Sequence, residues 1–212
     1  MSVLTPYAGQ LADGIAALGL DIPAATQARL IAFGELLLKW NKVYNLTAIR
    51  APQEVITHHL LDSLAVLPYL SAVTRLADIG SGGGLPGIPL AIVRPELSVI
   101  SVETVNKKAT FQQQAKIELG LGNFQPLNAR VENLKPEQPC DGVISRAFSS
   151  LKDFVELSGH LVGDGGALYA MKGVRPDDEV AALPAGWTVR ATHPLAVPGL
   201  DAERHLLVIA RG

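Results

Sequence analysis

Residues 80–84 form a glycine-rich loop in a place that suits ligand binding. Four of these five residues are glycine, and the loop follows the apolar segment 76–79 and precedes a segment expected to be helical. In an open parallel sheet, ligands bind at the carboxyl ends of the strands, where glycine lets the backbone approach a ligand closely. The loop therefore predicts a cofactor site. The alternative, a flexible turn, would explain neither the preceding strand nor the adjoining Asp78.

The carboxylate of Asp78 bears on which cofactor would bind. Gly82, Gly84 and Gly87 satisfy the pattern G-x-G-x-x-G, so a dinucleotide is one candidate. A carboxylate here would repel a pyrophosphate, whereas it would attract the ammonium group of S-adenosylmethionine. No Gly-Lys-Ser or Gly-Lys-Thr follows, which excludes a phosphate-binding P-loop. The other interpretation of Asp78 is that it only caps the loop.

Glu103 ends the second apolar segment, 99–102, and lies about 20 residues after the loop. An acid at this place can accept hydrogen bonds from both ribose hydroxyls, with either cofactor. A solvated acid at a strand end is the alternative interpretation.

Arg130 and Arg146 each follow a predicted strand. Arg130 lies in 128–132, directly after the expected third strand, and Arg146 lies in 145–148, after the fourth strand at 142–144. Because the carboxyl ends of parallel strands meet at one edge of a sheet, we expect both arginines near the glycine loop. Ordinary surface arginines are the alternative.

Two kinds of pattern predict the elements that position these residues. Residues 1–70 read as helices, with one apolar stripe beginning near Pro23 (Leu30, Phe33, Leu37, Trp40, Tyr44) and a second between Pro52 and Pro68 (Ile56, Leu60, Leu64, Leu67). From residue 71 onward, short apolar segments at 76–79, 99–102, 142–144 and 167–170 alternate with helical patterns near 107–119 and 150–162. This alternation predicts an α/β domain, 71–212, with a parallel sheet.

Segments 187–189 and 205–209 have no helix between them and should pair antiparallel at one edge of this sheet.

Composition narrows the class of protein further. The 212 residues are 48% hydrophobic and 18% charged, which fits a packed globular chain. The net charge of -2 means that any RNA would be bound through a local positive patch. Cys140 is the single cysteine, so we expect a packing role and a reducing, cytoplasmic location. We expect no signal peptide, membrane span or metal site, since His58-His59 has no further ligand spacing nearby.

Six stretches spread over nearly the whole chain share one family's pattern: 39–47, 58–63, 78–89, 145–151, 171–173 and 201–205. Trp40-Asn41-Lys42 and the Leu-Pro-Gly-Ile-Pro run at 85–89 are the most specific of these motifs. Together they closely resemble the RsmG (GidB) family of bacterial 16S rRNA guanine-N7 methyltransferases, which use S-adenosylmethionine. The resemblance implies a class I, Rossmann-like methyltransferase sheet with a helical N-terminal extension. It also implies a substrate within 16S ribosomal RNA, in a ribosomal particle.

The resemblance assigns cofactor contacts to Gly80, Leu85, Val131, Glu132 and Arg146. This chain has Glu103-Thr104 where many members have Asp-Ser, and Asn106-Lys107-Lys108 where a Lys-Arg pair is commoner. A glutamate is one methylene longer but still reaches a ribose, so only the detailed ribose geometry should differ.

If guanine N7 accepts the methyl group, its lone pair is already free, and no general base is needed. Catalysis should then depend mainly on positioning. Arg146 and Lys172 are the candidates for a catalytic role, and Arg146 would contact the methionine carboxylate or an RNA phosphate. Lys172, Arg204 and Arg130 are the candidates for RNA contacts, and with Arg146 they would make the local positive patch.

Several side chains have more than one interpretation. Tyr44, Phe148 and His58 could stack on the target base or belong to the core, and Asp62 could hydrogen-bond to His58. Two alternative functions also stay open. One is an S-adenosylmethionine-dependent methyltransferase for tRNA or a small molecule, and the other is a dinucleotide-binding module that transfers no methyl group.

Overall fold

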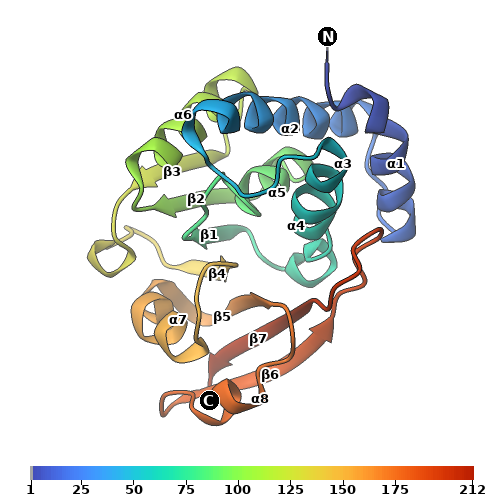
Figure 1. The fold of residues 1–212 in the computed structure, drawn as a ribbon. Helices are drawn as coiled ribbons and strands as arrows, with labels where there is room; N and C mark the ends of the chain where they lie inside the picture. Colours follow the sequence, from blue (N-terminus) through green and yellow to red (C-terminus); the bar gives the residue numbers. More distant parts are fainter. Residues whose placement is uncertain (1) are drawn as a thin grey trace.

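The computed structural model describes residues 2–212, and its centre is a seven-stranded sheet (Figure 1). The strand order is β3-β2-β1-β4-β5-β7-β6. The strands are β1 (Arg75–Ile79), β2 (Ser98–Glu103), β3 (Phe124–Asn128), β4 (Cys140–Ser145), β5 (Val162–Lys172), β6 (Trp187–Pro194) and β7 (His205–Arg211). The predicted alternation of strands and helices is confirmed for the first five strands, which run parallel. Their carboxyl ends therefore share one edge of the sheet.

The last two strands pair antiparallel with each other, as predicted, so β7 runs opposite to β5 and β6 runs in the same direction as β5. β7 pairs antiparallel with β5, with Leu168 opposite Ile209, and β6 pairs antiparallel with β7. β7 thus lies inside the sheet, while β6 forms its edge. A consequence for the site is that Lys172, at the end of β5, lies opposite His205, at the start of β7.

Helices cover both faces of the sheet. They are α1 (Ala8–Ala17), α2 (Ala24–Tyr44), α3 (Pro52–Glu54), α4 (Asp62–Leu64), α5 (Gly87–Val93), α6 (Asn106–Glu118), α7 (Leu151–Ser158) and α8 (Asp177–Ala181). Helix α2 packs on α5 and α6 on one side of the sheet, whereas α7 lies on the other (Figure 1). Two hydrophobic clusters match this division. The larger joins the N-terminal helices with α5 and α6, and the smaller joins α7 with the opposite face.

The first predicted apolar stripe is confirmed except at its end, where Tyr44 is 42% exposed. Helix α2 starts directly after Pro23, and Leu30, Phe33 and Leu37 are fully buried on it. Proline suits this boundary because its fixed φ is compatible with a helix start. The helix ends at Asn45, whose φ of 49° lies in the left-handed region that asparagine tolerates.

The second stripe lies on a helix with an unexpected central turn. Between α3 and α4, residues Val55–Leu61 form a π-helix (η2). Its backbone hydrogen bonds join residues five apart, so they close wider rings than the hydrogen bonds of an α-helix. Apolar periodicity alone predicts no such change. The π-helical turn sets the direction of every side chain that follows, including that of Asp62.

Some predicted boundaries were wrong by a few residues. The helix expected over 150–162 ends at Ser158, and β5 already begins at Val162 and runs to Lys172. A short 3-10 turn at Gly159–Leu161 replaces the last helical turn. Cys140, for which we expected a packing role, is the first residue of β4 and is buried in the smaller cluster.

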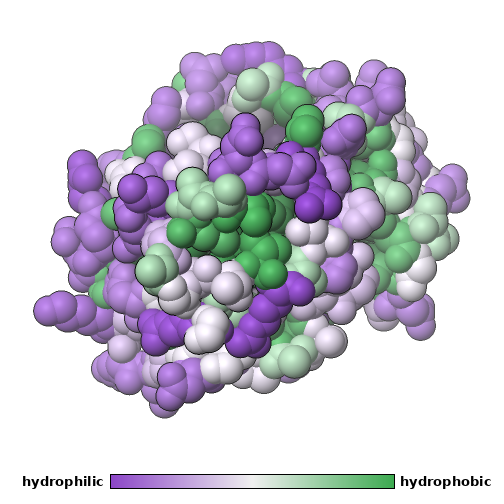
Figure 2. Space-filling model, turned by 90° about the horizontal axis from the view of Figure 1, so that it is seen from below, coloured by the Kyte–Doolittle hydropathy of each residue, from purple (hydrophilic) through white to green (hydrophobic). Residues whose placement is uncertain are grey.

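The surface seen from the side of β6 and α8 mixes hydrophilic and hydrophobic side chains, with one hydrophobic group near the centre of the view and others toward its right and top (Figure 2). Within residues 2–212, no helix is both long enough and apolar enough to cross a membrane.

Candidate cofactor and substrate cavities

The glycine loop is shaped by backbone angles that other residues adopt at a cost. Gly80, Gly82 and Gly84 have φ values of 67°, 58° and 79°. A Cβ atom on Gly80 would lie 2.6 Å from the Cβ of Ala147, and one on Gly84 would lie 2.3 Å from Cδ1 of Ile88. The loop therefore requires glycine at these three positions for its conformation, and at Gly80 and Gly84 also for close packing against the protein's own side chains.

Asp78 lies beneath this loop and is fully buried. Its Oδ2 accepts a 2.8 Å hydrogen bond from the backbone N–H of Gly87, while Oδ1 has no partner among the described residues. Burial raises the pKa of Asp78 to about 7, although the Gly87 N–H and the charge of Arg146 act in the opposite direction. The carboxylate does not line a cavity, so the structure favours the capping interpretation over direct attraction of a ligand ammonium group.

Glu103 connects the end of β2 to the glycine loop. Its Oε2 accepts a 2.8 Å hydrogen bond from the Gly82 N–H, and its Oε1 accepts one of the same length from the Val105 N–H. The interpretation as a solvated strand-end acid is wrong, since only 5% of the residue is exposed. A carboxylate has about four lone-pair sites, so it retains acceptor capacity for a ribose hydroxyl.

A buried polar network, which the sequence analysis missed, supports the loop from below. Ser101 Oγ donates to Oε1 of Gln112, and Nε2 of Gln112 donates to Ser81 Oγ and to the Gly82 carbonyl oxygen, each at 2.8 Å. Gln112 is fully buried on α6. A polar residue on the apolar face of a predicted helix was the available signal, because a buried amide needs partners.

Two neighbouring cavities open near the carboxyl ends of the strands. The smaller, about 200 Å³, is the loop cavity, and the larger, about 410 Å³, is the second cavity. The loop cavity is lined by Leu46, Thr47, His59, Gly80, Ser81, Gly82, Gly83, Leu85, Arg146 and Ala147. The second cavity is lined by Ile49, His58, His59, Asp62, Arg146, Met171, Lys172, Gly173, Leu195, Arg204 and His205. His59 and Arg146 line both, so they stand at the boundary between the two.

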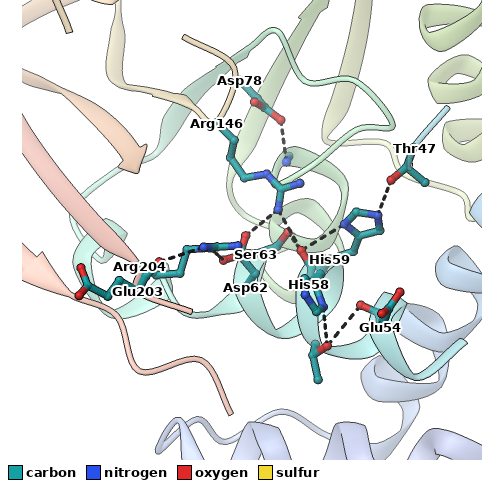
Figure 3. Close-up of polar contacts among 12 residues, drawn as sticks. Thr47, Glu54, His58, His59, Asp62, Ser63, Asp78, Arg146, Glu203 and Arg204 are labelled. Carbon is teal, nitrogen blue, oxygen red and sulfur yellow. Dashed lines mark hydrogen bonds and ion pairs between the residues drawn. The ribbon is translucent and has the colours of Figure 1, made fainter. Parts of the chain in front are cut away.

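Arg146 and Arg204 converge on one carboxylate (Figure 3). Nη1 of Arg146 donates to Oδ2 of Asp62 at 2.6 Å, and Nε of Arg204 donates to Oδ1 at 3.1 Å. Nη1 of Arg146 also lies 3.3 Å from the His58 carbonyl oxygen. The expected hydrogen bond from Asp62 to His58 is wrong, because the π-helical turn precedes Asp62 and both of its oxygens face arginines.

His59 is held by hydrogen bonds at both ring nitrogens. Its Nδ1 lies 3.1 Å from the His58 carbonyl oxygen, and its Nε2 lies 2.9 Å from Oγ1 of Thr47. A carbonyl oxygen only accepts, so Nδ1 carries the proton and Thr47 donates to Nε2. Burial and the charge of Arg146 lower the pKa of His59 to about 3. The imidazole at the boundary of the two cavities is therefore neutral.

Three of the four residues of the expected positive patch line the second cavity: Arg146, Lys172 and Arg204. The Nζ of Lys172 also donates to Glu179 at 2.9 Å. Arg130 is elsewhere, with its side chain 72% exposed and paired with Glu132 at 3.3 Å.

Gly80 and Leu85, two of the expected cofactor contacts, line the loop cavity. Val131 is buried in the smaller hydrophobic cluster, and Glu132 lies beside it in a short turn after β3. Neither residue lines the two cavities.

The candidate stacking residues have different surroundings. The Tyr44 ring stacks on Trp40 with centroids 5.1 Å apart, and Phe148 packs on Phe154 at the same centroid distance. His58 lines the second cavity. In the described part of the chain, no group of three or more His, Cys, Asp or Glu residues is arranged to hold a metal ion.

The sheet order, with β7 inserted antiparallel beside β5, and the glycine loop after β1 together define a class I methyltransferase fold. Solved structures agree on the fold. An S-adenosylmethionine-dependent methyltransferase from Aquifex aeolicus aligns with a TM-score of 0.58 at 15% identity, over 82% of this chain and 97% of that chain. The mitomycin 7-O-methyltransferase MmcR aligns with the same TM-score at 17% identity, over 93% of this chain and 75% of that chain.

Sequence comparison then defines the family. The model described as "GidB: rRNA small subunit methyltransferase G" matches residues 26–207, and the chain belongs to this family. A protein named ribosomal RNA small subunit methyltransferase G from Azoarcus sp. (strain BH72) is 99% identical over the full length of both chains. Proteins with the same name from Aromatoleum aromaticum and Pseudomonas aeruginosa are 64% and 49% identical, over 96% and 100% of this chain and 99% of each relative. The resemblance inferred from the motifs is confirmed.

Proposed function

We propose that this protein transfers a methyl group from S-adenosylmethionine to N7 of a guanine in 16S ribosomal RNA. The observation that carries the proposal is that the loop cavity and the second cavity meet at His59 and Arg146. A cofactor in the first and a base in the second would approach each other at this boundary. Family membership supports an rRNA substrate.

We assign the cofactor to the loop cavity and its rim. Gly80, Gly82 and Gly83 line this cavity without side chains, and Glu103, which accepts a hydrogen bond from the Gly82 N–H, keeps acceptor capacity for a ligand. Glu103 would accept hydrogen bonds from the ribose hydroxyls, and Arg146 would bind the methionine carboxylate. Gly80, Leu85, Val131 and Glu132 are the remaining proposed contacts. When bound, the cofactor supplies a methyl group on a positively charged sulfur.

The neutral His59 fits transfer to guanine N7. The N7 lone pair carries no proton, so the reaction needs no base, and neither nitrogen of His59 is free to serve as one. One positive charge moves from sulfur to the purine ring, and a neutral imidazole does not oppose it. The side chains around the boundary therefore act by holding donor and acceptor in line.

The RNA would approach from the side of the second cavity. Lys172 and Arg204 line this cavity, and we assign them to RNA phosphates or to the target nucleotide. Arg130 is exposed after β3 and would contact a more distant part of the RNA. The helical extension, residues 1–70, contributes cavity walls through Thr47, His59 and Asp62. We place the reaction in the cytoplasm, on a ribosomal particle.

The test combines binding with product analysis. Calorimetry with S-adenosylmethionine should show one site per chain, and NADH should give no heat. Purified protein should then form 7-methylguanosine in 16S RNA from small subunits of a strain lacking the enzyme, detected by nucleoside mass spectrometry. Methylation of tRNA alone would overturn the rRNA assignment, and binding of NADH alone would overturn the methyltransferase assignment.

A further inference from the structure

We infer that Asp62 is a positioning residue that fixes the guanidinium groups of Arg146 and Arg204 as one unit in the wall of the second cavity. The inference rests on the proposed function, because it assigns a task to the cavity in which the target nucleotide would lie. Asp62 would not touch the substrate. It acts through the two arginines, and we call these three residues the Asp62 cluster.

The Asp62 cluster joins three distant parts of the chain. Asp62 is the first residue of α4, Arg146 follows β4, and Arg204 precedes β7. Arg146 and Arg204 lie 84 and 142 residues from Asp62 along the sequence. Each takes a different oxygen of the carboxylate, so the two guanidinium groups do not compete for one acceptor (Figure 3).

Burial of the cluster is uneven, and this gives the carboxylate a role beyond packing. The Asp62 side chain is 4% exposed, whereas the Arg146 and Arg204 side chains are 26% and 28% exposed. The acid is thus enclosed by protein, while the arginines reach the cavity surface. Since an arginine carries five N–H donors, donors remain for a ligand in the cavity after the bonds to Asp62.

Charge explains why a carboxylate is needed at this point. Without it, two guanidinium groups at one cavity wall would repel each other and move apart. With it, the cluster carries one net positive charge instead of two. A purine ring that becomes positively charged in the reaction meets less opposition from such a wall. Asp62 therefore sets both the position and the net charge of the cation pair.

The experiment separates turnover from RNA affinity. Asp62→Asn keeps the size of the side chain and removes its charge. We expect kcat, at saturating S-adenosylmethionine and normalised to the protein that binds it, to fall about 10²-fold, as misplaced catalytic geometry does. KM for the RNA particle should stay level or fall, and its salt dependence should steepen, because the two arginines lose their counter-charge.

A matched control is Asp141→Asn. Asp141 accepts hydrogen bonds from Thr74 and Arg75 through one oxygen, at the other end of the sheet. Its loss should lower stability but leave kcat and KM unchanged. Asp62→Glu retains the charge and should keep more turnover per bound cofactor than Asp62→Asn. The inference is overturned if Glu is no better than Asn, or if Asp62→Asn turns over like the wild type.

A double-mutant cycle tests whether Asp62 works through its partner. In an Arg204→Gln background, Asp62→Asn should lower kcat by clearly less than in the wild type, because part of its task is already lost. Strictly multiplicative effects on kcat would contradict the inference. The wild-type assay distinguishes the two proposals: no 7-methylguanosine defeats the proposed function, whereas product with multiplicative variants defeats only the role of Asp62.

Discussion

Oε2 of Glu103 accepts a 2.8 Å hydrogen bond from the backbone N–H of Gly82, which joins the end of β2 to the loop after β1. The acid thus shapes the loop, in addition to its proposed contact with a ribose. Any change at Glu103 should alter the loop that lines the cavity as well as remove the proposed ligand contact.

We therefore expect Glu103→Gln to raise the dissociation constant for S-adenosylmethionine about 10-fold to 100-fold, as loss of hydrogen bonds to a charged group does. Calorimetry measures this directly. Glu96→Gln is the control, because Glu96 is an exposed acid paired only with Arg94. Equal dissociation constants for the wild type and Glu103→Gln would contradict the assignment of Glu103.

Gly80→Ala should weaken cofactor binding and lower stability. Its φ of 67° strains an alanine, and the new Cβ meets that of Ala147. Gly120→Ala offers a comparison at a similar φ of 60°, with nothing within 4 Å of the added Cβ. Both variants should lose about 1–2 kcal/mol of unfolding free energy from the left-handed backbone. Only Gly80→Ala should also lose cofactor affinity, and a loss in both would mean that the effect is indirect.

Arg204→Gln should reduce the salt dependence of RNA binding. Removing one phosphate contact lowers the slope of log K against log salt by about 1. Filter binding at a series of salt concentrations gives this slope. Arg190→Gln serves for comparison, since Arg190 is an exposed cation on β6. If the two variants change the slope equally, the contribution of Arg204 comes from overall charge alone.

Asp78 should make the protein less stable as the pH rises from about 4 to about 7. Its pKa is about 7 in the folded protein and near 3.8 in the unfolded chain, so in this range only the unfolded chain releases the proton. His59 acts in the opposite sense. Its pKa of about 3, against 6.5 unfolded, means that stability is lost as the pH falls below 6.5. The two dependences largely offset each other.

Asp78→Asn should remove the pH dependence of stability that comes from Asp78 and leave the one that comes from His59. The unfolding free energy of the variant, relative to that of the wild type, should gain about 3 kcal/mol between pH 4 and pH 7. Urea titrations across this range measure the difference. As a control, replacing the exposed Asp164 by asparagine should leave the unfolding free energy with the same pH dependence as in the wild type. If Asp78→Asn also shows the pH dependence of the wild type, Asp78 titrates normally.

Local sequence patterns were sufficient for most of the sheet and for part of the site. Apolar segments located every strand except β3, and the loop at 80–84 identified one cavity, although Glu103 does not line it. Side-chain partners distant in the sequence were not predictable, because no periodicity relates Asp62 to Arg146 or Arg204. The sequence also did not show which acidic side chains are buried. Asp78 adjoins a glycine loop in the sequence, yet the fold encloses it completely.

The π-helical turn at Val55–Leu61 makes the number of residues in this segment matter as much as their identity. Deleting one residue there would allow a regular α-helical ladder, with every hydrogen bond still made. Because the wider turn takes up one extra residue, this deletion would leave whatever follows on nearly the same side of the helix axis. The opposite holds if all seven residues become α-helical, because each residue of an α-helix turns by about 100°, which is more than in the wider π-helical turn. Asp62 would then turn away from both guanidinium groups. A change that makes this segment α-helical without removing a residue should therefore be tolerated by the fold and not by the second cavity.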